Sequence, residues 1–377
     1  MSVEERDNHP IISVANRGIT TLKGIEYFPN LKNLSCSKNP LDKLDVSTLT
    51  ELTSLTCMAD GLSELNLYEN NKLQRLNCAN NQLTSLVVLS DSLTKLDCYV
   101  NKLEKLDLTL VPNLKSLRCD QNSLKSLDLS NNQSLTSINC TYNNLTSLDL
   151  SKNTSLANVT NAMIGNQSVS LKANFDGNMI VIPFENSNLD NDNYVSSTLD
   201  DYGDGSGFNF ESFIAYDVSE IDGGIEYYCN TKLAGSENMK VSVTVSRDFH
   251  QVSFYADSEN TSLIGRAFAN DGQSVTAPEI KNPPQCKVLD TWSDTLDNVT
   301  GDKSIYANWK DAHSYSLSSF SNDTATVKCS ACGDTFTLSF INAVNSKKGD
   351  EKYSPYLDVT KDGVINAKDY ALLNKMK

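Results

Sequence analysis

The fold of this chain is decided by a pattern that is clearest in Leu114-Lys-Ser-Leu117-Arg-Cys119-Asp-Gln-Asn122-Ser-Leu124-Lys-Ser-Leu127-Asp-Leu129. Leucines recur at fixed intervals, and an asparagine follows the cysteine by three residues. The pattern returns along the first half of the chain, with cysteines spaced 20 or 21 residues apart at Cys36, Cys57, Cys78, Cys98, Cys119 and Cys140. A fixed period of this length indicates a solenoid built from stacked coils.

The repeated leucines and cysteines predict a leucine-rich repeat solenoid over residues 1–160. Each coil of such a fold turns these side chains inward, and its strand lies about 4.8 Å from the next, so neighbouring coils bury one another. An earlier unit carries Val14 in place of cysteine and predicts the first coil. We expect side-chain amides to satisfy backbone groups of adjacent turns and to form an internal ladder. Its members are Asn39, Asn81, Asn101, Asn122 and Asn143, and Asp60 replaces asparagine in one coil.

The regularly spaced cysteines have two interpretations, as reactive thiols or metal ligands and as small buried apolar residues. Free cysteine is among the residue types that proteins bury most often, which favours packing. Disulfides inside the ladder are disfavoured, because β-carbons one strand spacing apart exceed the usual separation of about 3.8 Å. We therefore expect free, buried thiols.

A repeat of this length with cysteine in the ladder position resembles the cysteine-ladder, internalin J-like branch of the internalins, a family of bacterial surface proteins. The resemblance extends from about Ile11 to Val159. It implies a curved, right-handed solenoid on a secreted or wall-attached bacterial adhesin. It also implies that the concave strand face binds a host or environmental protein or glycoprotein.

Side chains that flank the inward leucine and cysteine of each predicted strand should face outward on the concave surface. Most are small and polar, but the central coils combine charges with one aromatic ring, which suits a protein or glycan partner. The predicted ligand-binding patch comprises Arg75, Lys95, Asp97, Tyr99, Arg118 and Asp120. The alternative is an ordinary solvated face.

After Leu156 the leucine period stops and segments with strand-like patterns begin, at 168–173, 179–183, 213–218, 224–228 and 239–245. They predict an antiparallel, immunoglobulin-like β-sandwich over residues 161–247, which would also cover the apolar end of the solenoid. An acidic, glycine-rich stretch between two of these strands offers Asp200, Asp201 and Asp204 to calcium. Their spacing fits no standard calcium loop and favours a solvated turn.

Residues 248–311 are similar, in the order of their elements, to the B-repeats that follow the repeats of internalins. That similarity implies a small β-grasp-like module that acts as a spacer. Trp292 and Trp309 match core positions, and carbohydrate binding is the alternative role for them. Gln285-Cys286 stands where the B-repeat pattern has Gly-Tyr.

The end of the chain contains the EF-hand-type loop Asp358-Val-Thr-Lys-Asp-Gly-Val-Ile-Asn-Ala-Lys-Asp369. Oxygen ligands at positions 1, 3, 5, 7, 9 and 12, with glycine at position 6 for the sharp turn, predict a calcium site. The predicted ligands are Asp358, Thr360, Asp362, the Val364 carbonyl, Asn366 and Asp369.

Aspartate in place of glutamate at position 12 resembles dockerins, which implies docking onto a cohesin-type bacterial scaffold. A dockerin normally has two such loops, and only residues 340–345 could supply a helix of the first copy. Residues 312–377 are therefore identified as a C-x-x-C segment followed by a short, partly helical, partial dockerin-like calcium tail.

The pair Cys329-Ser-Ala-Cys332 is half of a zinc site, and it can equally form a disulfide or a redox pair. His313 offers a third ligand, but no fourth is evident in the sequence. We therefore favour a local knuckle or disulfide over zinc.

Composition excludes several classes of function. The 377 residues carry 32 Lys+Arg and 47 Asp+Glu, and the net charge of −15 repels phosphate backbones and anionic membranes. The apolar runs are shorter than the roughly 20 residues of a membrane span. The chain has 3 histidines, none in a metalloprotease or nucleophile-elbow motif, and the repeats and β modules leave no ordinary catalytic domain. We therefore expect a protein that is not an enzyme, does not bind nucleic acid and has no membrane span.

These patterns predict a mainly β, modular protein that acts as a secreted bacterial, internalin-like adhesin with calcium as its cofactor. We expect an extracellular or cell-surface location, with a signal peptide that the given sequence does not include. One alternative is a noncatalytic polysaccharide-binding subunit of a cohesin–dockerin-type complex. Another is a glycan hydrolase, because sequence cannot locate a catalytic carboxylate pair among so many acids.

Overall fold

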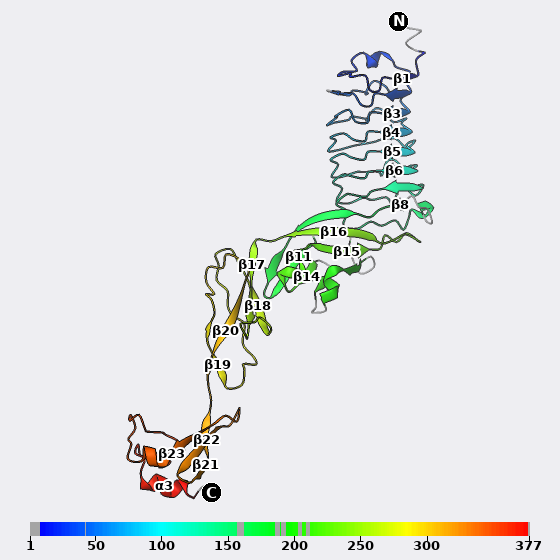
Figure 1. Cartoon of the computed structure of the whole chain (residues 1–377). Coiled ribbons are helices and arrows are strands. Elements are labelled where there is room, and N and C mark those ends of the chain that lie inside the picture. Colours follow the sequence, from blue (N-terminus) through cyan, green and yellow to red (C-terminus); the bar gives the residue numbers. More distant parts are fainter. Residues whose placement is uncertain are drawn as a thin grey trace. The chain divides into compact units, whose positions relative to one another are not determined.

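The computed structural model describes residues 8–41, 43–156, 162–184, 189, 194–202, 206–208 and 212–375 (Figure 1). The chain forms two compact units, Met1–Asp248 and Phe249–Lys377. Within the described ranges, no helix is long and apolar enough to cross a membrane.

The first unit begins with a parallel sheet in which the strands follow one another in chain order from β1 to β8 (Figure 1). Leu55, Leu76, Leu96 and Leu117 lie opposite one another on successive strands, so the coils are in phase. This register confirms the predicted leucine-rich repeat solenoid and its first coil. The strands are β1 (Ile11–Ser13), β2 (Asn33–Ser35), β3 (Ser54–Thr56), β4 (Arg75–Asn77), β5 (Lys95–Asp97), β6 (Ser116–Arg118), β7 (Ser137–Asn139) and β8 (Ala162–Met163). Short 3-10 turns lie at η1 (Ile25–Tyr27) and η2 (Thr154–Leu156).

The six ladder cysteines fill the interior of the coils, and each is 0% exposed and free. Burial raises the pKa of their thiols, to about 12 at Cys78 and Cys140. Neutral thiols in this setting behave as small apolar side chains rather than as nucleophiles. The packing interpretation of the cysteines is therefore confirmed.

The asparagine ladder is also confirmed. Asn122 donates from Nδ2 to the carbonyls of Cys98 (3.1 Å) and Cys119 (3.0 Å), and its Oδ1 accepts from the Leu103 amide (3.0 Å). Two coils earlier, Asn81 donates in the same way to the carbonyls of Cys57 and Cys78. Its Oδ1 accepts from two backbone amides, those of Asp60 and Leu62. Each amide thus satisfies backbone groups of adjacent coils that the stacking of coils removes wholly or partly from water.

Asp60 changes the ladder in its own coil, because a carboxylate accepts hydrogen bonds but cannot donate like an amide. Its Oδ1 accepts from the Asn39 amide (2.8 Å), and its Oδ2 lies 3.5 Å from the Cys36 thiol, which donates to it. Burial raises the pKa of Asp60, and these hydrogen bonds oppose the shift. The residue is 1% exposed, so the coil carries a buried acid where its neighbours carry a neutral amide.

A second ladder, which the sequence analysis did not identify, runs through the turns that follow the last leucine of each coil. Asn70 donates to the carbonyls of Val46 and Leu49, and Asn132 and Asn153 repeat this contact in later coils. Ser90 replaces asparagine in one coil. Its hydroxyl lies within hydrogen-bond distance of the carbonyls of Asn71 (2.8 Å) and Leu73 (2.7 Å). The recurring spacing Leu129-x-x-Asn132 and Leu150-x-x-Asn153 is the sequence signal for it.

Two packed sheets complete the first unit, in the orders β10-β11-β14-β13 and β12-β15-β16-β9. Phe213 on β14 and Tyr227 on β15 have ring centroids 5.3 Å apart, so the sheets share an aromatic core. The strands are β9 (Gln167–Lys172), β10 (Asn174–Asp176), β11 (Met179–Pro183), β12 (Tyr194–Ser197), β13 (Gly207–Phe208), β14 (Ser212–Ala215), β15 (Ile225–Cys229) and β16 (Met239–Ser246), with 3-10 turns η3 (Thr198–Tyr202) and η4 (Val218–Glu220). β9 and β16 pair in parallel, so the expectation of a purely antiparallel sandwich is wrong for this pair.

The sandwich packs on the last coil of the solenoid, as its predicted capping role requires. Tyr227 donates from its hydroxyl to the Thr146 carbonyl (2.7 Å), and the Leu150 amide donates to the Thr231 carbonyl (2.8 Å). Gln167, at the start of β9, continues the ladder by donating to the carbonyls of Cys140 and Ile164 (3.0 Å each). The sandwich therefore supplies the partners that a further coil would have supplied.

The second unit begins with a mixed sheet in the order β18-β17-β20-β19. Its strands are β17 (Phe249–Tyr255), β18 (Leu263–Asn270), β19 (Lys287–Trp292) and β20 (Lys303–Asp311). The Trp292 ring meets Phe254 edge-on at 5.0 Å, and Trp309 donates from Nε1 to the Ala256 carbonyl (2.8 Å). Both tryptophans thus contribute to the packing of this module. The fully described residues 249–311 contain no helix.

The last segment forms the sheet β21-β22-β23 and two short helices. The elements are β21 (Tyr315–Ser321), β22 (Thr324–Cys329), β23 (Thr335–Ser339), α2 (Phe340–Ala343) and α3 (Ala367–Leu373). Phe320, Phe340, Leu357, Ile365 and Leu373 belong to one buried cluster beneath them. The calcium-type loop is therefore attached to a core of its own.

Candidate functional site

The predicted concave patch lies on adjacent strands of the solenoid sheet. Arg75 on β4 pairs with Lys95 on β5, and Asp97 on β5 pairs with Arg118 on β6. The Arg118 guanidinium lies 4.0 Å from the centroid of the Tyr99 ring, in cation–π geometry. The strand pairing thus brings residues more than 40 positions apart in sequence onto one surface.

The charges of this patch differ in exposure. The side chains of Lys95 and Arg118 are 50% and 44% exposed, whereas those of Asp97 and Asp120 are 10% and 5% exposed. Lys95 Nζ lies 3.2 Å from Asp97 Oδ2, and Arg118 Nε lies 3.5 Å from Asp120 Oδ1. The aspartates were expected to face outward with the rest, but they lie beneath the cations and pair with them. The charge available to a partner is therefore mainly positive.

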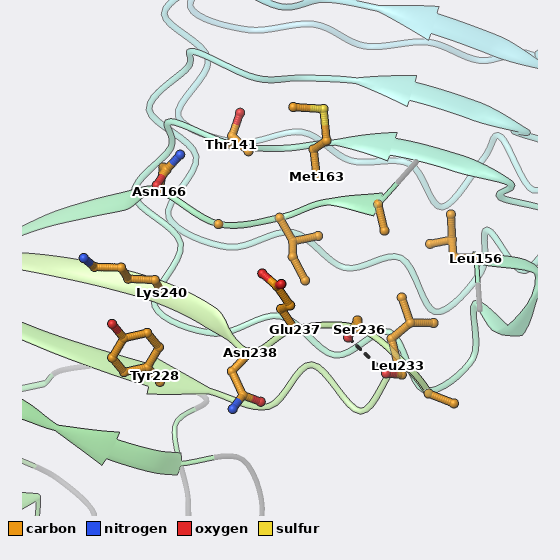
Figure 2. Close-up of a pocket in the computed structure, with 15 residues that line it drawn as sticks. Thr141, Leu156, Met163, Asn166, Tyr228, Leu233, Ser236, Glu237, Asn238 and Lys240 are labelled. Carbon is orange, nitrogen blue, oxygen red and sulfur yellow. Dashed lines mark hydrogen bonds between the residues drawn. The ribbon is translucent and has the colours of Figure 1, made fainter. Parts of the chain in front are cut away.

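A groove of about 880 Å³ lies where the last coil meets the sandwich (Figure 2). Its walls include Met163 and Asn166 from the solenoid side and Tyr228, Glu237 and Lys240 from the sandwich. The surface combines an aromatic ring with amide and charged groups, which is the composition of many polar-ligand sites. No local sequence pattern indicates this groove, because it arises from contact between two modules.

The calcium-type loop brings three carboxylates together. Oxygens of Asp358, Asp362 and Asp369 lie within 4.8 Å of one another, and Asp358 and Asp369 are buried. Thr360 Oγ1 contacts both Asp358 Oδ1 (3.3 Å) and Asp369 Oδ1 (2.9 Å). The oxygen-rich donor set is that of a hard cation such as Ca²⁺.

The backbone of the loop follows from its sequence. Gly363 has a φ of +82°, which favours glycine, and its amide donates to Asp358 Oδ2 (2.8 Å). Tyr353 also donates to this oxygen (2.6 Å), and its hydrogen bond lowers the pKa of Asp358. Asn366 and Asp369 form a capping box that starts α3. Val364, whose carbonyl was the predicted position-7 ligand, pairs with Lys347.

The segment before the loop includes residues 340–345, the stretch that alone could supply a helix of a first copy. α2 occupies residues 340–343, and the stretch after it pairs with the loop through the Asn345 and Ile365 amides, which donate to Ile365 and Ser346 carbonyls (2.7 and 3.0 Å). This partner segment carries no second set of acidic ligands.

The C-x-x-C pair lies in a larger group of side chains. Cys329 and Cys332 approach His313, as considered from the sequence, and also Cys286, which the sequence analysis did not connect with them. The Cys332 amide is the main donor to the Cys329 sulfur and lowers the pKa of Cys329 to about 5. Hydrogen bonding to Cys332 raises the pKa of Cys286 to about 12.

The acidic stretch of the sandwich is described only in part. Asp200 accepts hydrogen bonds from the Tyr194 hydroxyl (2.6 Å) and the Ser197 amide (2.7 Å), which is a turn arrangement. The side chains of Asp201 and Asp204 lie outside the described residues.

The stacked coils, the buried cysteines and the amide ladder define the first half of the chain as a leucine-rich repeat protein with a cysteine ladder. Among solved structures, it is similar to the functional domain of InlJ from Listeria monocytogenes, which includes a cysteine ladder, with 20% identity and a TM-score of 0.34 over 62% of this chain and 71% of that one. Internalin C2 from Listeria monocytogenes matches at 24% identity and a TM-score of 0.39, over 45% of this chain and 75% of that one. A leucine-rich repeat protein of Leptospira interrogans matches at 21% identity and a TM-score of 0.32, over 44% of this chain and 57% of that one. No protein-family model and no curated protein matches the sequence.

Proposed function

We propose that this chain is a noncatalytic, internalin-like bacterial adhesin, secreted or held at the cell surface, that binds an anionic glycoprotein through its solenoid sheet. The observation that carries the proposal is the exposed cationic and aromatic patch on a chain of net charge −15. Among the outward positions of β2 to β7, the charged residues are Arg75, Lys95, Asp97 and Arg118, and the one acid is largely buried.

The patch is rigid before a partner arrives. Arg75, Lys95, Asp97 and Arg118 stand on hydrogen-bonded strands, Tyr99 and Asp120 lie just after two of these strands, and the buried aspartates pair with the two central cations. Tyr99 is further positioned by Arg118 above its ring and by a contact of its hydroxyl with Met58 sulfur (3.6 Å). A preformed surface loses little side-chain entropy when it binds, which favours affinity.

Charge selects the class of partner. The negative field of the whole chain repels anions, so an anionic ligand is attracted only where cations are exposed together. Sulfated or sialylated glycans and acidic protein segments carry the required charge, and sugar rings also stack on tyrosine.

Binding to immobilised mucin glycoproteins tests this proposal. We expect Tyr99→Ala and Lys95→Gln to weaken binding at least about tenfold, equivalent to about 1.4 kcal/mol. Lys125→Gln, which neutralises an exposed lysine outside the strands, is the matched control and should bind like the wild type. Enzymatic removal of sialic acid and sulfate should abolish binding. Equal binding by wild type, Tyr99→Ala and Lys95→Gln would reject the concave patch.

Arg118 is tested with a paired design, because its loss leaves Asp120, at 5% exposed the more deeply buried of the two aspartates, without its cation. Lys95→Gln/Asp97→Asn is the equivalent folding control for Lys95→Gln. The double variant Arg118→Gln/Asp120→Asn removes both charges and should fold like the wild type. We expect it to bind mucin as weakly as Lys95→Gln. Unchanged binding by the folded double variant would contradict a role for Arg118.

A second candidate function is polysaccharide binding as a noncatalytic subunit of a cohesin–dockerin-type complex. The groove with Tyr228 and its polar neighbours favours it, because neutral polysaccharides bind through rings and hydrogen bonds rather than charge. Tyr228→Ala would weaken binding to immobilised neutral polysaccharides such as arabinoxylan or mixed-linkage glucan under this function and leave mucin binding unchanged. Cleavage of any polysaccharide in the same panel would contradict the noncatalytic assignment.

The calcium-type loop supports a docking tail in either function. Asp358, Thr360, Asp362, the Val364 carbonyl, Asn366 and Asp369 would hold the ion, and the ion would replace mutual carboxylate repulsion with attraction. Calcium-dependent capture of a secreted cohesin-bearing protein by the full chain, lost in Asp358→Ala, is the expected result of the docking test. Capture that persists in EDTA would contradict calcium-dependent docking.

A further inference from the structure

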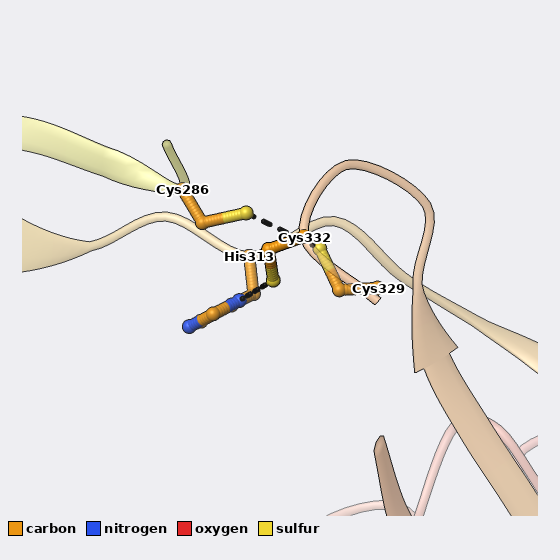
Figure 3. A group of neighbouring side chains, drawn as sticks. All are labelled: Cys286, His313, Cys329 and Cys332. Carbon is orange, nitrogen blue, oxygen red and sulfur yellow. Dashed lines mark hydrogen bonds between the residues drawn. The ribbon is translucent and has the colours of Figure 1, made fainter. Parts of the chain in front are cut away.

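Four metal-ligand side chains from separate segments meet in the second unit (Figure 3). Cys286 directly precedes β19, His313 lies between β20 and β21, Cys329 ends β22, and Cys332 follows in the next turn. Their ligand atoms all lie within 4.8 Å of one another. This convergence is independent of the concave patch and of the calcium loop.

The spacing fits a tetrahedral ion. Cys286 Sγ lies 3.4 Å from Cys329 Sγ, and Cys332 Sγ lies 3.3 Å from His313 Nδ1. Zinc bonds of about 2.3 Å to sulfur and about 2.0 Å to nitrogen place the atoms of a tetrahedral Cys3His set roughly 3.5–3.8 Å apart, close to these two distances. Small side-chain rotations therefore bring all four atoms to bonding distance of one centre.

The surrounding backbone and charges fit the same ion. Gly333 follows Cys332 with a φ of +79°, and its amide donates to the Cys329 carbonyl (3.0 Å), which closes a tight turn around the sulfurs. On the far side of the imidazole, His313 Nε2 lies 3.9 Å from Asp311 Oδ1. In zinc sites a carboxylate often accepts a hydrogen bond from the second nitrogen of the bound imidazole, and Asp311, which here pairs with Lys287, is the carboxylate within reach of that role.

The cluster lies where two separately packed parts of the unit join. One core contains Val252, Phe254 and Ile305, and the other contains Phe320, Phe340 and Leu373. Gln285, just before β19, donates to the Ala331 carbonyl across this junction, while the Ala312 amide extends the β19–β20 pairing by donating to the Cys286 carbonyl (2.8 Å). An ion at this point would cross-link the two parts where apolar packing is sparse.

We propose that Cys286, His313, Cys329 and Cys332 bind one Zn²⁺ ion in a tetrahedral structural site. The three thiols release their protons to solvent as their sulfurs bond to the ion, and the neutral imidazole binds through Nδ1. With all four positions filled by protein, no coordination site remains for water, so the ion is structural rather than catalytic. A disulfide would use two of the three sulfurs and leave the third and the imidazole without a role.

The test measures the metal content of the full chain, purified with zinc and without added reductant. We expect about one zinc per chain by elemental mass spectrometry. After replacement by Co²⁺, we expect the absorption of a tetrahedral thiolate complex, which an oxygen-ligand loop cannot produce. Absence of bound zinc in the wild type, or a disulfide between any two of Cys286, Cys329 and Cys332 in this preparation, would overturn the proposal.

Variants locate the ion. Cys286→Ser and His313→Gln should lose zinc and the cobalt absorption. His250→Gln removes an imidazole elsewhere in the unit, and Asp358→Ala disables the calcium-type loop, so both should keep them. Full zinc content in Cys286→Ser or His313→Gln would also reject the site. The wild-type stoichiometry depends on no variant, so the proposal stays falsifiable if a variant fails to fold.

Discussion

The ladder asparagines should differ in how much each contributes to stability. A backbone carbonyl in the ladder can accept from two asparagines, whereas a backbone amide donates to one. The Cys98 carbonyl accepts from both Asn101 and Asn122, so removal of one donor leaves the other. The Leu103 amide, in contrast, donates within this ladder to Asn122 Oδ1. The number of amides that each asparagine accepts from should therefore set its contribution to stability.

We predict that Asn122→Ala lowers the free energy of unfolding of the first unit by about 2 kcal/mol, since it leaves one buried amide unsatisfied. Asn81→Ala should cost about 3 kcal/mol or more, because it strands the amides of both Asp60 and Leu62. Urea unfolding measures both. Asn113→Ala, at an exposed asparagine, is the control, and equal losses in all three would contradict this ranking.

Asp60 makes stability depend on pH. Its pKa in the folded state is raised above the ordinary 3.8, because burial disfavours the charged form. Its contribution to stability is therefore fully present below that ordinary value and is lost as pH rises through the raised folded pKa.

We predict that Asp60→Asn stabilises the first unit at pH 7 by about 1 kcal/mol and removes this loss, because an amide has no charge to bury. The advantage of the variant should grow as pH is raised from 3.8 toward neutrality in urea-unfolding experiments. Asp45→Asn is the control with the opposite sign, since hydrogen bonds from Ser47 lower the pKa of Asp45. A pH-independent difference between Asp60→Asn and the wild type would refute the prediction.

At the scale of elements, the calcium-type loop and α3 share their residues. Asp369 belongs both to the capping box of α3 and to the carboxylate cluster. Ile365, which lies in the loop just before α3, is 0% exposed. Ion binding and helix formation should therefore be coupled.

We predict that calcium raises the melting temperature of the second unit and that Asp358→Ala abolishes this shift. Calorimetry with and without added calcium, at constant zinc content, measures it, because EDTA would also remove zinc from the proposed cysteine–histidine site. Glu351→Ala removes an exposed acid just before the loop and should keep the shift. A calcium shift of unchanged size in Asp358→Ala would contradict the assignment.

The sequence predicted elements well where one coil repeats another. Cysteine and leucine spacing located the strands of the solenoid, because each side chain meets its own copy one period later. The parallel pairing of β9 with β16 was not predicted, since those strands are separated by the rest of the sandwich and alternation of side chains does not report direction. Local patterns specify strands, whereas tertiary packing specifies their partners.

At the scale of the whole molecule, the two compact units hold different kinds of stabilising groups. The first contains the buried thiol and amide ladders, and the second contains both clusters of candidate metal ligands among the described residues. Units with separate cores unfold as separate transitions.

We predict two calorimetric transitions for the full chain. EDTA should lower the transition of the second unit and leave that of the first unchanged. The variant Asn81→Ala should do the reverse, and it is the matched comparison. A single transition that responds to both changes would show that the units unfold together.

The sites were less accessible to sequence reasoning than the elements. The calcium-type loop was found because its ligands lie within 12 residues of one another. Cys286 lies 43 residues before Cys329, and no local pattern connects them, because the pairings of β19 with β20 and of β21 with β22 are both needed to bring them together. The burial of Asp97 and Asp120 depends on neighbouring coils in the same way.

The first and last strands of two modules, β9 with β16 and β17 with β20, pair in parallel. In such a pair the chain enters at one end and leaves at the other, so tension along the chain pulls the strands past each other lengthwise. The hydrogen bonds that join them then bear the load together and do not open one after another. We therefore expect each module to resist stretching, a property that would serve the proposed surface-held adhesin when a partner pulls on it.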